Sequence, residues 1–338
     1  KNHKKGDFFS IVSQRRFHPA FQKTRELIEE VFEKTKCPIT SIQITHSDGQ
    51  WRLPNEIIDI PYHSFDKGYG KCSHSGYHFV DILCYFLEPQ NNSSKRADNA
   101  EIYSTFVRPI DFIEQLTLSD YHRLFSGFKS YNSYTKNKLS QMVKKFGEID
   151  AFINVSFKKA DRIITVASLN LIHNGFSQRG TLFPNEDLYK GNGRVRHESY
   201  IIEQGPFQAI HIDSLQSQET NPSIKPGFEY GDEYHFDIHV FRNSAFNKKW
   251  KSYESISLDR FPQQKMSGRS RGHQEDARRS AVLEFLDFLE GKNRGSTTSD
   301  LSKHENTVTI LAGAYQSAAL KFNEKNPIVN IRFQSNQK

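Results

Sequence analysis

The sequence predicts an α+β fold in which helices cover one face of a large, mostly antiparallel, open-faced sheet. Strand-like segments gather in the middle of the chain at hairpin spacing, and helix-like segments lie toward its two ends. The chain does not show the regular alternation of strand and helix that a parallel sheet requires. Helices segregated from antiparallel strands in this way are typical of the α+β class.

Three segments carry the periodicity of long helices. The first spans residues 19–35, because Pro19 suits a first helical turn and Cys37-Pro38 ends the pattern. The second spans residues 274–290, and the third residues 301–321. Shorter helical pieces are expected around 119–128 and 136–146.

The strands are predicted from β-branched and aromatic residues that alternate with polar ones. The clearest pair is Ala151–Phe157 and Arg162–His173, which the polar Lys158–Asp161 joins as a hairpin. A short apolar run at Phe8–Gln14 is also expected to be a buried strand. The remaining predicted strands are Ile39–His46, Ile102–Val107, Ser199–Ile202, Gln208–Ser214, Tyr234–Phe241 and Ile328–Phe333.

Composition limits the class of protein. With 46 Lys and Arg against 39 Asp and Glu the formal charge is +7, but the basic residues are scattered and no nucleic-acid-binding motif accompanies them. No apolar run approaches the roughly 20 residues of a membrane span, and Lys1–Gly6 does not open a signal peptide. Three cysteines without zinc-type spacing favour reduced thiols. We therefore expect a cytoplasmic protein without a nucleic-acid or membrane partner.

The stretch that organises the chain is Gly68–Leu87. Gly68 and Gly70 form a flexible loop, and apolar residues recur at helical spacing from about Ser75 onward. His74, His78 and Asp81 lie at this loop–helix junction, and on a regular helix they would share one face. Two imidazoles and a carboxylate at an exposed helix start predict a reactive site.

The same residues could also be metal ligands. Two histidines at i and i+4 can share zinc, but no glutamate follows the first one, so the metalloprotease motif fails. His235-Phe-Asp237-Ile-His239 would face one way on a strand and suits non-haem iron, but it also fits the ordinary solvent face of an antiparallel sheet. We expect no metal.

Five motifs in order resemble the C-terminal half of the Gfo/Idh/MocA oxidoreductases, the family named for glucose–fructose oxidoreductase and inositol dehydrogenase. The resemblance covers nearly the whole chain. The motifs are Gln14-Arg-Arg-Phe-His-Pro-Ala-Phe21, Gly68-x-Gly70, Ser75-Gly-Tyr-His78-x-x-Asp81, Asp276-Ala-Arg…Glu284-Phe and Ala314-Tyr-Gln-Ser-Ala318.

The resemblance implies an enzyme whose N-terminal Rossmann domain holds NAD or NADP and whose sheet domain holds the substrate and makes oligomer contacts. No G-x-G-x-x-G follows an early strand here, and the Glu-Lys-Pro motif of the family is absent. We therefore expect residues 1–17 to be the last strand and exit of a missing or truncated Rossmann domain. Residues 18–338 would be the substrate-binding and oligomerisation domain.

The resemblance also implies the chemistry. In the family a base takes the hydroxyl proton of a sugar or polyol while the carbon gives hydride to the nicotinamide. The family pattern Asp-x-x-x-His matches His78, but His74 stands in the aspartate position. We predict His78 and His74 as catalytic residues, since imidazole can act as a base near neutral pH.

Further residues are predicted to bind ligands. Arg15 and Arg16 follow the first predicted strand and are candidates for cofactor contacts, and Arg16 also for substrate. Trp51 and Arg52 lie in an irregular segment, where binding residues concentrate. Lys71 and Asp81 complete the predicted substrate-binding set.

The resulting prediction is the substrate-binding half of an NAD(P)-dependent oxidoreductase. Its substrate would be a sugar, polyol or related hydroxy compound, and its open sheet would form a homo-oligomer. The alternative is a non-catalytic binding or scaffold protein that keeps the sheet without a nucleotide-binding domain.

Overall fold

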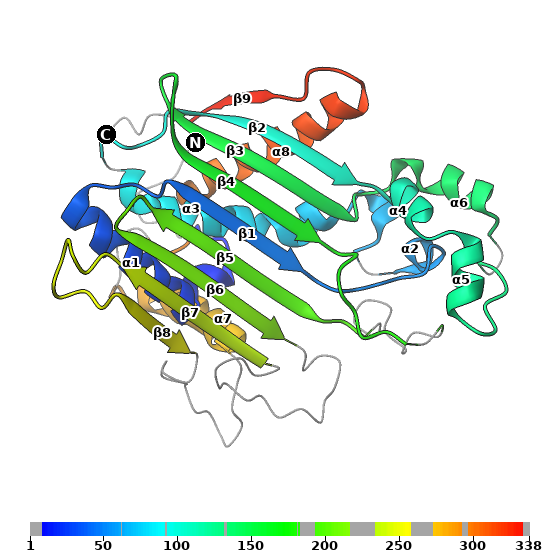
Figure 1. Cartoon of the computed structure of the whole chain (residues 1–338), viewed down its shortest axis with the longest axis horizontal. Coiled ribbons are helices and arrows are strands. Elements are labelled where there is room, and N and C mark those ends of the chain that lie inside the picture. The colour runs from blue at the N-terminus through cyan, green and yellow to red at the C-terminus, as the bar shows by residue number, and fades with distance from the viewer. Residues whose placement is uncertain are drawn as a thin grey trace.

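The structure is a computed structural model that describes residues 9–61, 63–91, 93–131, 134–180, 182, 193–216, 234–257, 273–292 and 297–333. Its centre is one nine-stranded sheet with the order β8-β7-β6-β5-β1-β4-β3-β2-β9 (Figure 1). The strands are β1 Ser41–Ser47, β2 Asn99–Val107, β3 Asp150–Lys159, β4 Arg162–Ile172, β5 Arg196–Gln204, β6 Gln208–Gln216, β7 Tyr234–Arg242, β8 Tyr253–Ser257 and β9 Val329–Arg332.

All neighbouring strands in this sheet are antiparallel except β1 and β4. Four long helices, α1 Pro19–Thr35, α3 Tyr77–Asn91, α7 His273–Leu289 and α8 Glu305–Phe322, lie behind the sheet in Figure 1. The predicted α+β class, with a mostly antiparallel sheet and helices on one face, is confirmed. None of the helices in the described ranges is long and apolar enough to cross a membrane.

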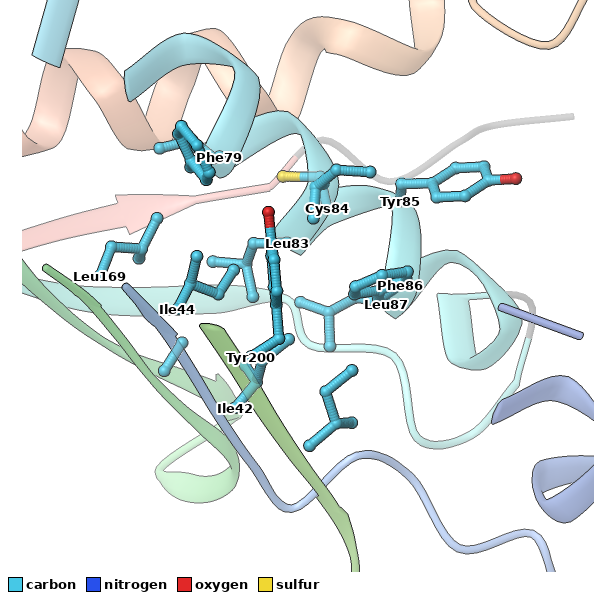
Figure 2. Close-up of a cluster of buried hydrophobic side chains, with 14 of the residues drawn as sticks. Ile42, Ile44, Phe79, Leu83, Cys84, Tyr85, Phe86, Leu87, Leu169 and Tyr200 are labelled. Atoms are coloured by element: carbon cyan, nitrogen blue, oxygen red, sulfur yellow. The ribbon is translucent and has the colours of Figure 1, made fainter. Parts of the chain in front are cut away.

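The core lies between α3 and the middle of the sheet. α3 turns Phe79, Leu83 and Phe86 toward the sheet, where Ile42 and Ile44 of β1 meet them (Figure 2). These five side chains are fully buried. Burial of each contributes roughly 1.5–3 kcal/mol, so this contact fixes where α3 begins relative to the sheet.

A smaller lobe lies beyond one end of the sheet (Figure 1). Its own apolar cluster centres on Tyr121, Tyr131 and Leu139. The lobe is built from the short helices α2 Glu56–Asp59, α4 Pro109–Gln115, α5 Leu118–Leu124, α6 Lys136–Met142 and the 3-10 turn η4 Val143–Lys145. Other short helical turns are the 3-10 turns η1 Gln14–Phe17, η2 Phe65–Lys67 and η6 Leu301–His304. The segment η3 Cys72–Gly76 is a single turn of π-helix, called the π-turn below.

The strand expected at Phe8–Gln14 is wrong. Phe8 lies outside the described residues, Ser10 makes a single antiparallel bridge with Asp300, and Gln14 already begins η1. The segment does not pack as a buried strand, because its apolar side chains Phe9 and Val12 remain exposed. The other predicted strands form within a few residues of their expected bounds, and β8 is an additional strand.

Candidate functional site

One end of the sheet gathers most of the buried charge. β1 and β4 run parallel, with His46 opposite Leu171, so their carboxyl ends meet at one edge. β5 starts at the same edge, because Glu198 pairs with His46 in antiparallel register. The turn after β1, the end of β4 and the start of β5 therefore lie side by side.

The loop that begins α3 is tied to this edge through Glu148. The Lys71 N–H donates to the Glu148 carbonyl at 2.9 Å, and the Cys72 N–H donates to Glu148 Oε1 at 2.7 Å. A Cβ atom on Gly70 would lie 2.2 Å from the Glu148 carboxyl carbon, which explains the glycine. The π-turn Cys72–Gly76 follows directly and carries His74.

A buried ionic network surrounds Asp48. Lys71 Nζ donates to Asp48 and lies 2.9 Å from His46 Nδ1. Arg194 donates to the other Asp48 oxygen at 2.8 Å, and His173 Nδ1 lies 3.1 Å from Asp48 Oδ2. All five side chains are buried, so these contacts replace the water that the charges would otherwise keep.

The network continues toward Arg15. His46 Nε2 lies 3.4 Å from Asp48 and 3.9 Å from Glu198, so it bridges the two carboxylates. Arg15 forms a fork to both oxygens of Glu198 at 2.7 Å, and the Tyr200 hydroxyl donates to the same group at 3.1 Å. The Arg15 guanidinium lies 4.2 Å over the Phe79 ring. The predicted cofactor residue Arg15 is thus held by this carboxylate.

The two predicted catalytic histidines lie at opposite ends of this network. The His74 ring contacts those of His63 and His173, with centroid separations of 4.0 and 6.4 Å. His78 follows in α3, where the charges of Arg15 and Glu198 act on it. The π-turn adds a residue to the helical turn that holds His74. The two rings therefore have different neighbours.

Both histidines are neutral at physiological pH. Burial, with the neighbouring His63 charge, lowers the pKa of His74 to about 4. Burial, with the Arg15 charge, lowers the pKa of His78 to about 4. Burial also lowers the pKa of Lys71 to about 8, despite Asp48, so the ammonium stays charged at neutral pH. The junction therefore offers two neutral imidazoles near buried cations, with Lys71 acting on His74 and Arg15 acting on His78.

The histidine pKa values predict an acid-labile fold. An unfolded histidine titrates near 6.5, so between about pH 6.5 and 4 the unfolded chain binds protons that folded His74 and His78 refuse. The free energy of unfolding should fall as the pH is lowered through this window. Urea unfolding at several pH values should show a smaller fall in the double variant His74→Gln, His78→Gln. The exposed His122→Gln should keep the wild-type slope, and an equal slope in all three would contradict the assignment.

Asp81 and Arg16 form a separate buried pair. Arg16 Nη2 lies 2.8 Å from Asp81 Oδ1, and both side chains are fully buried. His304 Nδ1 lies 3.0 Å from the same carboxylate, which also accepts from Ser13 and Thr307. These contacts fix η1 to α3 and α8. We therefore assign Arg16 and Asp81 to the framework beneath the site.

The remaining predicted binding residues divide between two places. Arg52 is buried, donates to Gln50, and lines a small cavity together with His74 and His173. Lys71 lies in the ionic network described above. Trp51 instead stacks on Tyr121 and Phe125 of the lobe, with ring centroids 6.2 and 5.2 Å apart. Arg52 and Lys71 are thus brought to the junction, whereas Trp51 packs on the lobe.

Within the described ranges no group of three or more His, Cys, Asp or Glu side chains could hold a metal ion. In the segment His235–His239, considered above as an iron site, His235 Nε2 lies 2.8 Å from Asp213 Oδ2. His197 Nε2 lies 2.7 Å from the other oxygen of the same carboxylate. His239 instead contacts the Tyr253 hydroxyl at 3.0 Å. The motif residues therefore take separate partners.

Sequence reasoning missed His46, Asp48, His173 and Arg194 as parts of the site. His46–Gln50 has the composition of a turn, and that is what the sequence suggested. The available signal was His46 and Asp48 at the end of β1, and His173 directly after β4. It becomes informative only with the parallel pairing of β1 and β4.

Comparison with solved structures identifies the fold. A levoglucosan dehydrogenase in complex with NADH and L-sorbose matches with a TM-score of 0.54 and 12% identity, over 97% of this chain and 67% of that one. The chain shares its fold with this dehydrogenase over nearly the whole of its own length. An oxidoreductase domain protein from Kribbella flavida has a TM-score of 0.50, 12% identity and coverage of 96% and 65%.

A mutant of Gal80p from Saccharomyces cerevisiae, named as a super-repressor, also matches, with a TM-score of 0.50, 10% identity and coverage of 97% and 65%. The chain spans about two thirds of the length of these solved structures. No family model and no curated protein matches the sequence. At such low identity the likeness establishes the fold alone.

Proposed function

We propose that the chain is the substrate-binding half of an NAD(P)-dependent oxidoreductase that acts on a sugar, polyol or related hydroxy compound. The observation that carries the proposal is His78. Its ring is neutral, and its Nδ1 is buried without a hydrogen-bond partner in the part of the chain that the structure describes. A buried polar atom in this state costs roughly 1–3 kcal/mol, which a bound ligand hydroxyl would offset.

The described residues do not fit a complete dinucleotide. The turn after β1, His46-Ser-Asp-Gly-Gln50, lacks the glycine spacing that lets a backbone approach a pyrophosphate, and the sheet contains one parallel pair. We infer that residues 18–338 serve the substrate and that a nucleotide-binding domain outside them holds the cofactor. Bound there, the cofactor would accept hydride from the substrate carbon.

The residues of this chain would then position and deprotonate the substrate. A neutral imidazole at His78 can accept the hydroxyl proton, and Arg15 with Glu198 holds a fixed charge pair beside it. His74 and Arg52 line a cavity of only about 10 Å³, which is too small for a sugar, so we assign them to shape the wall of the site rather than to enclose the substrate. Lys71 and Asp48 hold the floor of the site rigid, because both are buried and paired.

A non-catalytic binding or scaffold protein is the second candidate. The low pKa of both His74 and His78 favours it, because a base with a pKa near 4 is weak at neutral pH.

In either case we propose that a second copy packs on the open sheet face, where Val166 and Tyr253 are exposed.

Calorimetric titration of NAD and NADP tests the proposal. The ligands are titrated into this chain and into a chain extended upstream in its gene. We expect binding to the extended chain alone, because the described residues lack a dinucleotide loop. If neither chain binds either cofactor, the oxidoreductase proposal fails and the scaffold candidate replaces it.

A further inference from the structure

A second cavity lies away from the histidines, between the end of β2, the last turns of α8 and the turn η4. It has a volume of about 440 Å³, and its lining includes neither His74 nor His78. Small-molecule sites typically occupy about 300–1,000 Å³. We call it the β2–α8 pocket, and its walls, rim and floor differ in chemistry.

The walls are aromatic and apolar. Phe106 and Tyr315 meet edge to face with ring centroids 5.2 Å apart, and Phe146 and Phe322 complete the walls. α8 contributes Ala319 to the lining, and this small side chain leaves the space open. Such walls favour a ligand with an apolar or aromatic body.

The rim is cationic. Lys321 Nζ donates to the hydroxyls of Tyr103 and Thr105 at 2.8 and 2.6 Å, so its charge has neutral partners there. Lys145 is exposed at the pocket edge. Arg108 lies 3.9 Å over the Phe322 ring and 3.9 Å from Asp111. Three cations against one rim carboxylate favour an anionic ligand group.

The floor is a buried acid, Glu148. Its Oε1 accepts from the Tyr315 hydroxyl at 3.0 Å and from the Cys72 N–H at 2.7 Å. Burial raises the pKa of this carboxyl. The floor supplies no cation, whereas the rim supplies three, so an anionic group of a ligand is favoured at the rim and the ligand has one orientation.

We propose that the β2–α8 pocket binds a small organic carboxylate with an aromatic or aliphatic body. The body lies between Phe106 and Phe322, and the carboxylate meets Lys145 and Lys321. The proposal is independent of the oxidoreductase function, because it uses none of the residues assigned to substrate or proton transfer.

The test is calorimetric titration of 3-phenylpropionate into the whole chain. We expect saturable 1:1 binding, with 3-phenylpropan-1-ol at least about tenfold weaker because it lacks the charge. The cation 3-phenylpropylammonium should give no saturable heat. Absence of saturable 3-phenylpropionate binding at millimolar ligand, or equal binding of all three compounds, would overturn the proposal.

Variants locate the binding. Lys145→Glu and Lys321→Glu should each weaken 3-phenylpropionate binding about tenfold, and Ala319→Trp should abolish it by filling the pocket. The matched control is Lys325→Glu, an exposed lysine in the turn that follows α8, which does not line the pocket. If Lys325→Glu and Lys145→Glu lose equal affinity for 3-phenylpropionate, the effect comes from the net charge of the protein, and the proposal that the pocket is the binding site is wrong. Lys145 is exposed, so its variant remains decisive if Ala319→Trp fails to fold.

Discussion

Replacing Asp81 with asparagine is expected to lower the free energy of unfolding by about 3–5 kcal/mol. The Asp81 carboxylate is fully buried and pairs with Arg16, which is also fully buried. Without it, the one close carboxylate partner of the guanidinium among the described residues is Glu88, at 2.7 Å. A buried charge that loses its main partner cannot recover the lost water contacts. Urea unfolding at neutral pH measures the loss.

The control for this experiment is Glu26→Gln. Glu26 pairs with Lys23 at 3.1 Å on the surface of α1, and its side chain is 67% exposed. We expect a change within about 0.5 kcal/mol. A loss below about 1 kcal/mol in Asp81→Asn would contradict the framework role. The double variant Arg16→Met, Asp81→Leu should lose less than the sum of its single variants, because it removes both buried charges together.

Replacing His78 with alanine is expected to lower kcat/KM by about 10²–10⁴-fold in the protein extended upstream, assayed with the hydroxy compounds it oxidises. The reason is the loss of the only proton acceptor we assign to the hydroxyl group. His74→Ala should have a smaller effect, mainly on KM, because His74 lies against His63 and His173 at the far end of the network.

Two measurements separate catalysis from folding here. The thermal unfolding midpoint of His78→Ala should stay well above the assay temperature, so that the variant is folded in the assay, and its cofactor affinity should not change. The exposed His122→Ala is the matched control and should keep full activity. Wild-type turnover in His78→Ala would remove this residue from the mechanism.

The sequence was most informative where local rules decide the structure. The first helix was predicted at residues 19–35, and the structure forms it at Pro19–Thr35, because proline and an apolar face mark its start and orientation. The hairpin of β3 and β4 followed from alternation alone. The prediction for the segment before η1 was wrong, because a short apolar run does not distinguish a strand from an irregular segment.

The candidate site could be predicted only in part. Gly70, His74 and His78 lie close together in the sequence, so the loop–helix junction that carries them could be predicted. The network beneath them was not visible, because Asp48, His173 and Arg194 come from three segments that meet only through the pairing of β1 with β4 and β5. The buried Arg16–Asp81 pair was also hidden, because sequence does not reveal which side of η1 faces the core.

The central position of β1 has a consequence for how the chain folds. β2, β3 and β4 can pair soon after synthesis, and so can β5 through β8, since each run joins strands that follow one another. β1 pairs only with partners made much later, because Ser41 meets Val166 on one side and Glu203 on the other. β1 precedes all the other strands of this sheet in the chain, so it must wait and then close the gap between two preformed blocks. Non-local pairing of this kind slows folding and leaves strand edges exposed to aggregation until β1 is in place.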